Sequence, residues 1–255
     1  MTRFTATAML LALTLPATSW AIVDIHDRYY AAPKGGGLTS FGVELSGATG
    51  DKDELNLGLE NHTVFRRKNG NTFLLVGEIA REELNDVRTD DTAFAHLRYA
   101  RHNGSAHGFE VFAQYEEDVF ASLTSRELIG GGYRYEWKPG SDNERGLAGV
   151  GLFHETEEYT ITSVVRKTTR INSYVTLATP VNEAGTASVA LTAYAQPAVD
   201  DFSDIRAIAV LTLNVAITEN VDFRVTYDYQ YDGSPETGLA SSNGEFSTGI
   251  FYTFK

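Results

Sequence analysis

The dominant feature of this sequence is an alternation of apolar and polar residues, kept up in segments of about ten residues from Leu38 to the end of the chain. The clearest case is segment 221–231, where Val, Phe, Val and three Tyr alternate with Asp, Arg, Thr, Asp and Gln. Successive side chains of a β-strand point to opposite faces, so this pattern predicts strands with one apolar face and one polar face. No segment shows a helical period of comparable length. The alternation therefore restricts the chain to an all-β fold.

Twelve segments follow this pattern, and twelve is an even number. The last one, FSTGIFYTFK, keeps the alternation up to Phe254, which is unusual because chain ends are commonly frayed. We expect it to be a closing strand that pairs with the strand starting at Leu38. The expected strands are 38–47, 54–67, 71–83, 91–102, 106–117, 125–138, 145–157, 168–179, 185–196, 206–217, 220–231 and 245–254.

The connections between these segments alternate in kind. Even-numbered connections such as KNGN and TEN are short and consist of residues that tolerate tight turns, whereas odd-numbered ones such as ELNDVRTD tend to be longer and acidic. Long loops at one rim and tight turns at the other are typical of a transmembrane antiparallel up-and-down β-barrel of a bacterial outer membrane. A β-sandwich has no reason to sort its connections in this way.

The apolar face is expected to point outward, into lipid. Its stretches have the length of a tilted membrane strand, and aromatic residues gather at strand ends, as in Tyr133, Tyr135 and Trp137. The opposite face carries charges of both signs, which can pair across a lumen. A secreted β-sandwich or a lipocalin-like soluble barrel stays open as the alternative, and partitioning into outer membranes would distinguish the two.

The first 21 residues have the pattern of a secretory signal peptide: Arg3, a short apolar core, Pro16 and small residues around the cleavage point after Ala21. We expect a periplasmic arm or linker over 22–37 and the barrel over 38–255. An even strand number places both termini in the periplasm. The net charge of -13 argues against nucleic acid or anionic lipid as the main partner, and the sequence contains no cysteine. No cofactor is predicted.

Polar residues of three consecutive expected strands are predicted to share the lumen. They could form a charged constriction that selects small solutes or a salt-bridged plug that fills a narrow barrel. Phe94 and Phe112 share this face and favour the plug, and the glycines at 130–132 would let a bulky neighbour approach closely. The predicted lumen polar cluster consists of Arg98, Glu110, Gln114, Glu116, Arg134 and Glu136.

The acidic connections suggest divalent cations, because hard cations prefer clustered oxygen ligands. The richest candidate is the loop with Asp200, Asp201 and Asp204, although it lacks the ordered spacing and glycine of a dedicated calcium loop. A group of Glu155, Glu157 and Glu158 is a second acidic connection in this interpretation. Such runs are more commonly solvated surface, or share bridging cations with the phosphates of lipopolysaccharide.

A hydrolytic site at the rim is a weaker hypothesis. His154 with Glu155 and Glu157 would lie there, but their spacing matches no recognised nucleophile or metal motif. No catalytic residue is therefore assigned, and we expect that the protein is not an enzyme.

Segment 96–137 is the most distinctive part of the chain, with LRY, FEVFAQYEEDVF, SREL and IGGGYRY in succession. It resembles the family of small exported bacterial proteins labelled salt-induced outer membrane proteins, clearly over about 40 residues and more vaguely elsewhere, including the final YTFK. The resemblance implies an outer membrane barrel of undefined biochemical activity, and it supplies no catalytic residues.

The terminal strand also resembles the signal that the outer membrane assembly machinery reads. Its candidate residues are Phe246, Ile250, Tyr252 and Phe254. Such proteins typically finish on an aromatic residue, whereas this chain has Lys255 after Phe254. If Phe254 is the residue that is read, deletion of Lys255 leaves assembly intact.

The sequence thus predicts a structural or envelope-adaptation barrel, with at most a narrow solute path. A small-solute channel and a rim-sited lipid or peptide hydrolase are the alternatives. The expected partners are outer membrane lipid, lipopolysaccharide and the assembly machinery, with divalent cations at the acidic loops.

Overall fold

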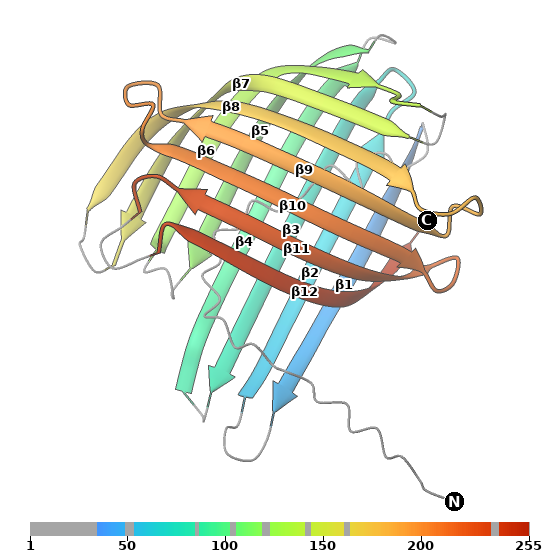
Figure 1. Ribbon diagram of the computed structural model, residues 1–255, viewed down its shortest axis with the longest axis horizontal. Coiled ribbons are helices and arrows are strands. Elements are labelled where there is room, and N and C mark those ends of the chain that lie inside the picture. The colour runs from blue at the N-terminus through green and yellow to red at the C-terminus, as the bar shows by residue number, and fades with distance from the viewer. Residues whose placement is uncertain are drawn as a thin grey trace, which may run out of the picture.

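The computed structural model describes residues 35–48, 54–84, 87–102, 106–118, 123–140, 144–160, 164–235 and 240–254. These residues form a closed antiparallel β-barrel, as Figure 1 shows. Among them, no helix is long and apolar enough to cross a membrane. The strands are β1 (Gly36–Ala48), β2 (Glu54–Arg66), β3 (Asn71–Leu84), β4 (Val87–His102), β5 (His107–Asp118), β6 (Leu123–Trp137), β7 (Arg145–Tyr159), β8 (Val165–Pro180), β9 (Ala187–Pro197), β10 (Ile205–Ala216), β11 (Val221–Asp232) and β12 (Ser242–Phe254).

Each strand pairs antiparallel with the next along the chain, and β12 closes the barrel against β1. The prediction of twelve up-and-down strands is confirmed, with boundaries that differ by a few residues. β1 begins at Gly36, inside the expected arm, because the ladder with β2 extends to the pair Gly36 and Arg66. The expected signal peptide and the rest of the arm lie outside the described residues.

The apolar faces of the strands point outward, as the sequence predicts. In β5 exposed and buried residues alternate strictly over ten positions, from His107 to Glu116. Outward side chains such as Phe109, Ile129 and Phe246 are all more than 60% exposed. A barrel whose outer surface is apolar and whose interior is polar inverts the arrangement of a soluble barrel, and it suits lipid because closure satisfies every backbone group.

The difference in loop length between the two rims is smaller than predicted. Only 85–86 separate β3 from β4, and 119–122 separate β5 from β6, whereas 138–144 separate β6 from β7 at the rim that was expected to have tight turns. Six of the eight residues of the acidic sequence ELNDVRTD belong to strands, because polar residues do not prevent backbone pairing beyond the apolar band. Strand pairing and the outward apolar face, and not the loop lengths, therefore identify the fold as a membrane barrel.

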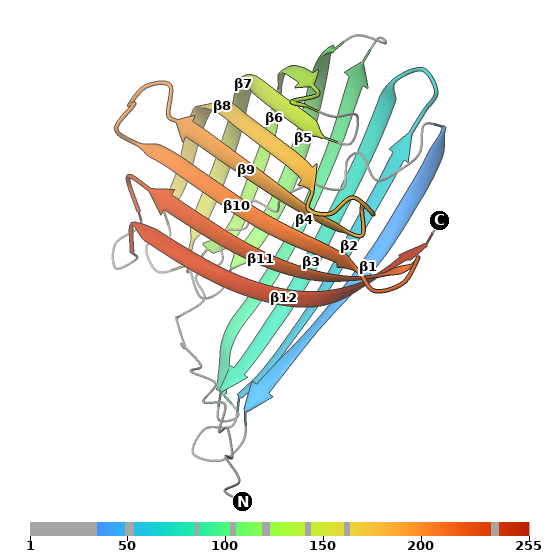
Figure 2. The same cartoon turned by 45° about the vertical axis from the view of Figure 1, so that its right-hand side comes forward.

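The barrel has two rims, which differ in the connections they contain. The terminal rim contains the start of β1, the end of β12 and the β2–β3 turn, and the loop rim is the opposite one, with the connections β7–β8, β9–β10 and β11–β12. Thr39 pairs with Phe254, so the first and last strands meet at the terminal rim. Figure 2 shows β1 and β12 running apart from this meeting point toward the loop rim.

Candidate functional site: the charged lumen

The interior of the barrel is filled with side chains. Every strand contributes at least one inward residue that is no more than 7% exposed. Polar side chains predominate, in contrast to the apolar core of a soluble barrel. One buried inward residue from each strand in order is Ser40, His62, Val76, Arg98, Glu116, Arg134, Glu155, Arg170, Thr192, Val210, Arg224 and Phe251.

Glu110 organises a first group, here called the terminal-side network: Arg98, Glu110, Arg134, Glu136 and Tyr174. Glu110 Oε2 accepts from Nη1 of Arg98 at 3.1 Å and from Nη1 of Arg134 at 3.2 Å. Its Oε1 accepts from the hydroxyl of Tyr174 at 2.9 Å, and Arg134 Nη2 reaches Glu136 at 3.4 Å. β4 and β6 flank β5, so the carboxylate lies between two guanidinium groups that neutralise it.

Glycines make room for the aromatic residues of this region. A Cβ on Gly149 would lie 2.2 Å from the ring of Tyr174, and one on Gly130 would lie 2.6 Å from the ring of Phe112. The close approach expected for the glycine-rich segment of β6 is therefore seen at Gly130. Tyr174 lies over Gly149 and can thus extend toward Glu110, three strands away.

A short chain of hydrogen bonds continues from this network along β4 and β5. Arg98 Nε donates to His96 Nε2 at 3.4 Å, and His96 Nδ1 lies 3.1 Å from Gln114 Oε1. Gln114 Nε2 in turn donates to Glu116 Oε2 at 3.3 Å. Gln114 therefore connects the terminal-side network to a second group nearer the loop rim.

This loop-side network consists of Glu116, Arg126, Glu155, Glu157, Arg170 and Arg206. Glu155 accepts hydrogen bonds from three arginines: Arg126 at 2.8 Å, Arg170 at 2.6 Å and Arg206 at 3.0 Å. Arg206 also donates to Glu157 at 2.8 Å, and Arg126 lies 3.5 Å from Glu116. All six residues are nearly fully buried. Three guanidinium groups thus face three carboxylates, which is the pairing that buried charge requires.

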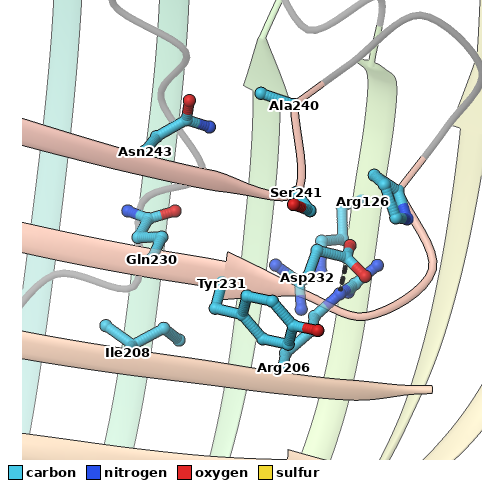
Figure 3. A pocket seen from close by; sticks show the side chains of 10 residues that line it. Arg126, Arg206, Ile208, Gln230, Tyr231, Asp232, Ala240, Ser241 and Asn243 are labelled. Carbon is cyan, nitrogen blue, oxygen red and sulfur yellow. Dashed lines mark hydrogen bonds and ion pairs between the residues drawn. The ribbon is translucent and has the colours of Figure 1, made fainter. Parts of the chain in front are cut away.

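Two aspartates close the network at the loop rim. Asp204 accepts from Arg170 at 3.0 Å, and Asp232 accepts from Arg206 at 3.1 Å. Figure 3 shows this rim, with Arg126 and Arg206 at the floor of a small cavity that Asp232 and Ser241 also line. The cavity has a volume of about 30 Å³, enough for about one or two water molecules. Arg126 and Arg206 therefore border a space at the loop rim that is large enough for water.

A third contact group lies next to the closure of the barrel. The guanidinium of Arg224 lies 4.0 Å from the centre of the Phe251 ring, and its Nε donates to Asn214 at 3.0 Å. Arg224 Nη1 also reaches Glu60 at 3.5 Å, and Glu60 contacts His62. This group links β10, β11, β12 and β2 across the closure.

The structure brings together most of the predicted lumen cluster but divides it. Arg98, Glu110, Arg134 and Glu136 belong to the terminal-side network, whereas Glu116 belongs to the loop-side network and Gln114 bridges the two. Sequence reasoning missed the arginine half of the loop-side network: Arg126, Arg170 and Arg206. Their alternation with outward residues in β6, β8 and β10 was the available signal.

Glu155 and Glu157 correct the acidic-loop interpretation. Both lie inside β7 with no exposed surface and pair with arginines, so they are not a solvated connection. The rim-hydrolase grouping is wrong for the same reason. His154 is exposed on the outer face, where its Nδ1 lies 3.1 Å from Thr169 Oγ1, because neighbouring residues of a strand point to opposite sides.

The predicted cation loop separates its three aspartates. Asp204 is engaged by Arg170, and Asp201 accepts from the backbone and hydroxyl of Ser203 at 2.9 Å and 2.6 Å. These hydrogen bonds hold the pKa of Asp201 below its usual range, and Asp200 is exposed. Among the described residues, no group of three or more His, Cys, Asp or Glu could hold a metal ion. A cation at this loop stays a prediction.

The residues of the predicted assembly signal share one face of β12. Phe246, Ile250, Tyr252 and Phe254 are 67%, 56%, 45% and 52% exposed on the outside of the barrel. Val43 pairs with Ile250 and Thr39 with Phe254, which confirms the expected pairing of the last strand with the first. Lys255 lies outside the described residues, and the reading of this strand by an assembly machinery stays a prediction.

Solved structures with the same architecture are outer membrane barrels. The NanC porin has 11% sequence identity to this chain and a TM-score of 0.50, with 84% of this chain and 98% of the porin covered. The translocator domain of the autotransporter NalP from Neisseria meningitidis has 11% identity and a TM-score of 0.51, with 91% and 92% covered. At such low identity, these likenesses show the fold alone. No curated protein matches this chain.

A family model described as protein of unknown function, DUF481, matches residues 39–254, which include all or part of each of the twelve strands. The description defines no activity and no inducing condition, so the label salt-induced stays a prediction. The chain belongs to the DUF481 family of proteins of unknown function.

Proposed function

We propose that this protein is a closed outer membrane barrel with a structural role in the cell envelope, with both termini in the periplasm and at most a narrow solute path. The observation that carries the proposal is the filled lumen, in which each of the twelve strands contributes a buried inward side chain. Arg134, Glu155, Glu157 and Arg170 are 0% exposed, so water does not reach them from either rim.

The periplasmic placement of the termini rests on the even strand number, which puts the start of β1 and the end of β12 at one rim. Export by the predicted signal peptide would bring the whole chain into the periplasm, and a barrel inserted from there would keep its terminal rim on the periplasmic side. The outward apolar face supports insertion into lipid, since this surface would otherwise be exposed to water.

A small-solute channel is the second candidate, and the polar nature of the filling favours it. Ion pairs can exchange partners, and the cavity at the loop rim ends directly on Arg126 and Arg206. NanC is described as a porin, so a channel is compatible with this architecture. In that case the loop-side network would be a gate that opens, whereas in the structural proposal it is a permanent plug.

Conductance in planar bilayers tests the proposal. We expect the purified barrel to give no steady current, and we expect Arg134→Ala to introduce small conductance steps, because it removes the guanidinium that joins Glu110 to Glu136. The exposed Lys138→Ala at the same rim is the control and should stay closed. Steady, solute-dependent current through the unaltered protein would overturn the structural proposal in favour of the channel.

A further inference from the structure

The terminal rim has a hollow on the outer side of the barrel wall, independent of the charged lumen. It lies between the start of β1 and the β2–β3 turn and has a volume of about 690 Å³, in the range of small-molecule sites. Gly35–Gly37 form one wall, and Phe65, Arg67, Lys68 and Phe73 form the other. The backbone N–H of Gly35 donates to the carbonyl of Arg66 at 2.6 Å, which holds the two walls together.

The hollow is a basic spot on an acidic protein. The chain has a net charge of -13, yet Arg66, Arg67 and Lys68 follow one another here. Arg67 and Lys68 are exposed, and among the ion pairs between described residues none involves either of them. Two exposed cations that form no ion pair within the described part of the chain favour an anionic ligand.

The same hollow has an apolar base. Phe65 and Phe73 are directly opposite each other in the β2–β3 ladder, and they are 54% and 37% exposed on the outer face. The Phe73 ring lies 4.9 Å from that of Tyr99, and the Arg67 guanidinium lies 5.7 Å from the centre of the Phe73 ring. The cations therefore lie next to an aromatic platform that belongs to the lipid-facing surface.

A ligand for this arrangement must be anionic at one end and apolar at the other. We propose that the hollow binds an anionic phospholipid, with its headgroup phosphate at Arg67 and Lys68 and its acyl chain over Phe65 and Phe73. A soluble acidic partner would leave the aromatic platform unused, and free phosphate would use only the cations. The proposal does not depend on whether the lumen is plugged or conducting.

The test compares how three added compounds bind to the purified protein and change its thermal stability. The full chain is purified in an uncharged detergent, and its thermal transition and its retained lipids in native mass spectrometry are measured with phosphatidylglycerol, with phosphatidylethanolamine and with inorganic phosphate. We expect phosphatidylglycerol alone to raise the transition and to remain bound. The double variant R67Q/K68Q should weaken this binding by about tenfold to thirtyfold, since each cation near a lipid surface contributes about 1 kcal/mol.

The control removes the same charge elsewhere. K138Q/K167Q changes two exposed lysines outside the hollow and should bind phosphatidylglycerol like the unaltered protein. Single Lys68→Gln, at an exposed turn position, keeps the test valid if the double variant folds poorly. The proposal fails if R67Q/K68Q retains phosphatidylglycerol fully, if the control loses it equally, or if phosphate alone gives the same shift. It also fails if the lipids have no effect, as expected if the segment preceding Gly35 fills the hollow.

Discussion

The loop-side network and the closure of the barrel hold the wall together in different ways. β6 and β7 pair over fourteen positions, and inside the lumen Glu155 joins arginines from the neighbouring strands β6 and β8 and from the more distant β10. β1 and β12 pair over five positions only, from Thr39 to Val43, and among the described residues β1 then continues with β2 alone. One region depends on buried charge and the other on a short ladder with tightly packed inward residues.

Strands with the same alternating pattern therefore stabilise the barrel in different ways, depending on which residues their inward side chains contact. Along β7 the inward glutamates meet charges of opposite sign, whereas at the closure Gly42 meets the ring of Phe251, which also contacts the guanidinium of Arg224. We expect substitutions in the network to cost electrostatic free energy and those at the closure to act through packing.

The largest effect is expected for Glu155→Ala. It leaves three buried guanidinium groups without their shared carboxylate, and removing one partner of a buried ion pair typically costs about 3–5 kcal/mol. The free energy of unfolding in urea, followed by circular dichroism of the refolded barrel, measures the loss. Glu158→Ala, three positions along the strand and exposed, is the matched control. Equal effects of the two variants would contradict a stabilising network.

An intermediate effect is expected for Gly42→Val at the closure. A Cβ at this position would lie 2.2 Å from the Phe251 ring, so the ring must shift, and its contact with Arg224 must change as well. Overpacking of this kind costs about 1–3 kcal/mol. The folded fraction on unheated gels, where intact barrels migrate differently from unfolded chains, reports the change.

Combining this change with Phe251→Ala sharpens the result. The smaller side chain removes the clash, so the double variant should be more stable than the sum of the single effects predicts. Strict additivity would mean that Gly42 and Phe251 do not pack against each other at the closure.

The smallest effect is expected for Tyr174→Phe in the terminal-side network. It removes one hydrogen bond to Glu110, which keeps Arg98 and Arg134, so the loss should be about 1–2 kcal/mol. Urea unfolding measures it against Tyr227→Phe, an exposed tyrosine on the outer face. A loss as large as that of Glu155→Ala would place the main stabilising centre at Glu110 instead.

Much of the fold could be predicted because period-two alternation acts locally. The strand at 106–117 and the closing strand at 245–254 were located within a few residues, and their apolar faces point outward as expected. Acidic composition predicts the positions of the loops less well, since the acidic segment 83–90 is mostly strand. Polarity indicates where the lipid-facing band ends, but it does not indicate where backbone pairing ends.

The candidate site was only half predictable. Strand alternation places Arg98, Glu110 and Arg134 on one face, and neighbouring strands bring them into contact. Contacts between distant strands, such as Arg206 of β10 with Glu155 of β7, depend on how the barrel curves, and no sequence spacing encodes that. Asp204 was similarly assigned to a loop surface, although Arg170 reaches it from inside the barrel.

The sequence by itself determined the strand number, the outward apolar face and part of the inward charge, because side-chain direction in a strand follows from backbone geometry alone. Only the tertiary structure decided which charges pair, since closing twelve strands brings together residues as far apart as Glu60 and Arg224. It also decided that Gly42 and Phe251 meet where β1 and β12 close the barrel. Closure is a property of the whole ring, so its contacts cannot be deduced from any single segment.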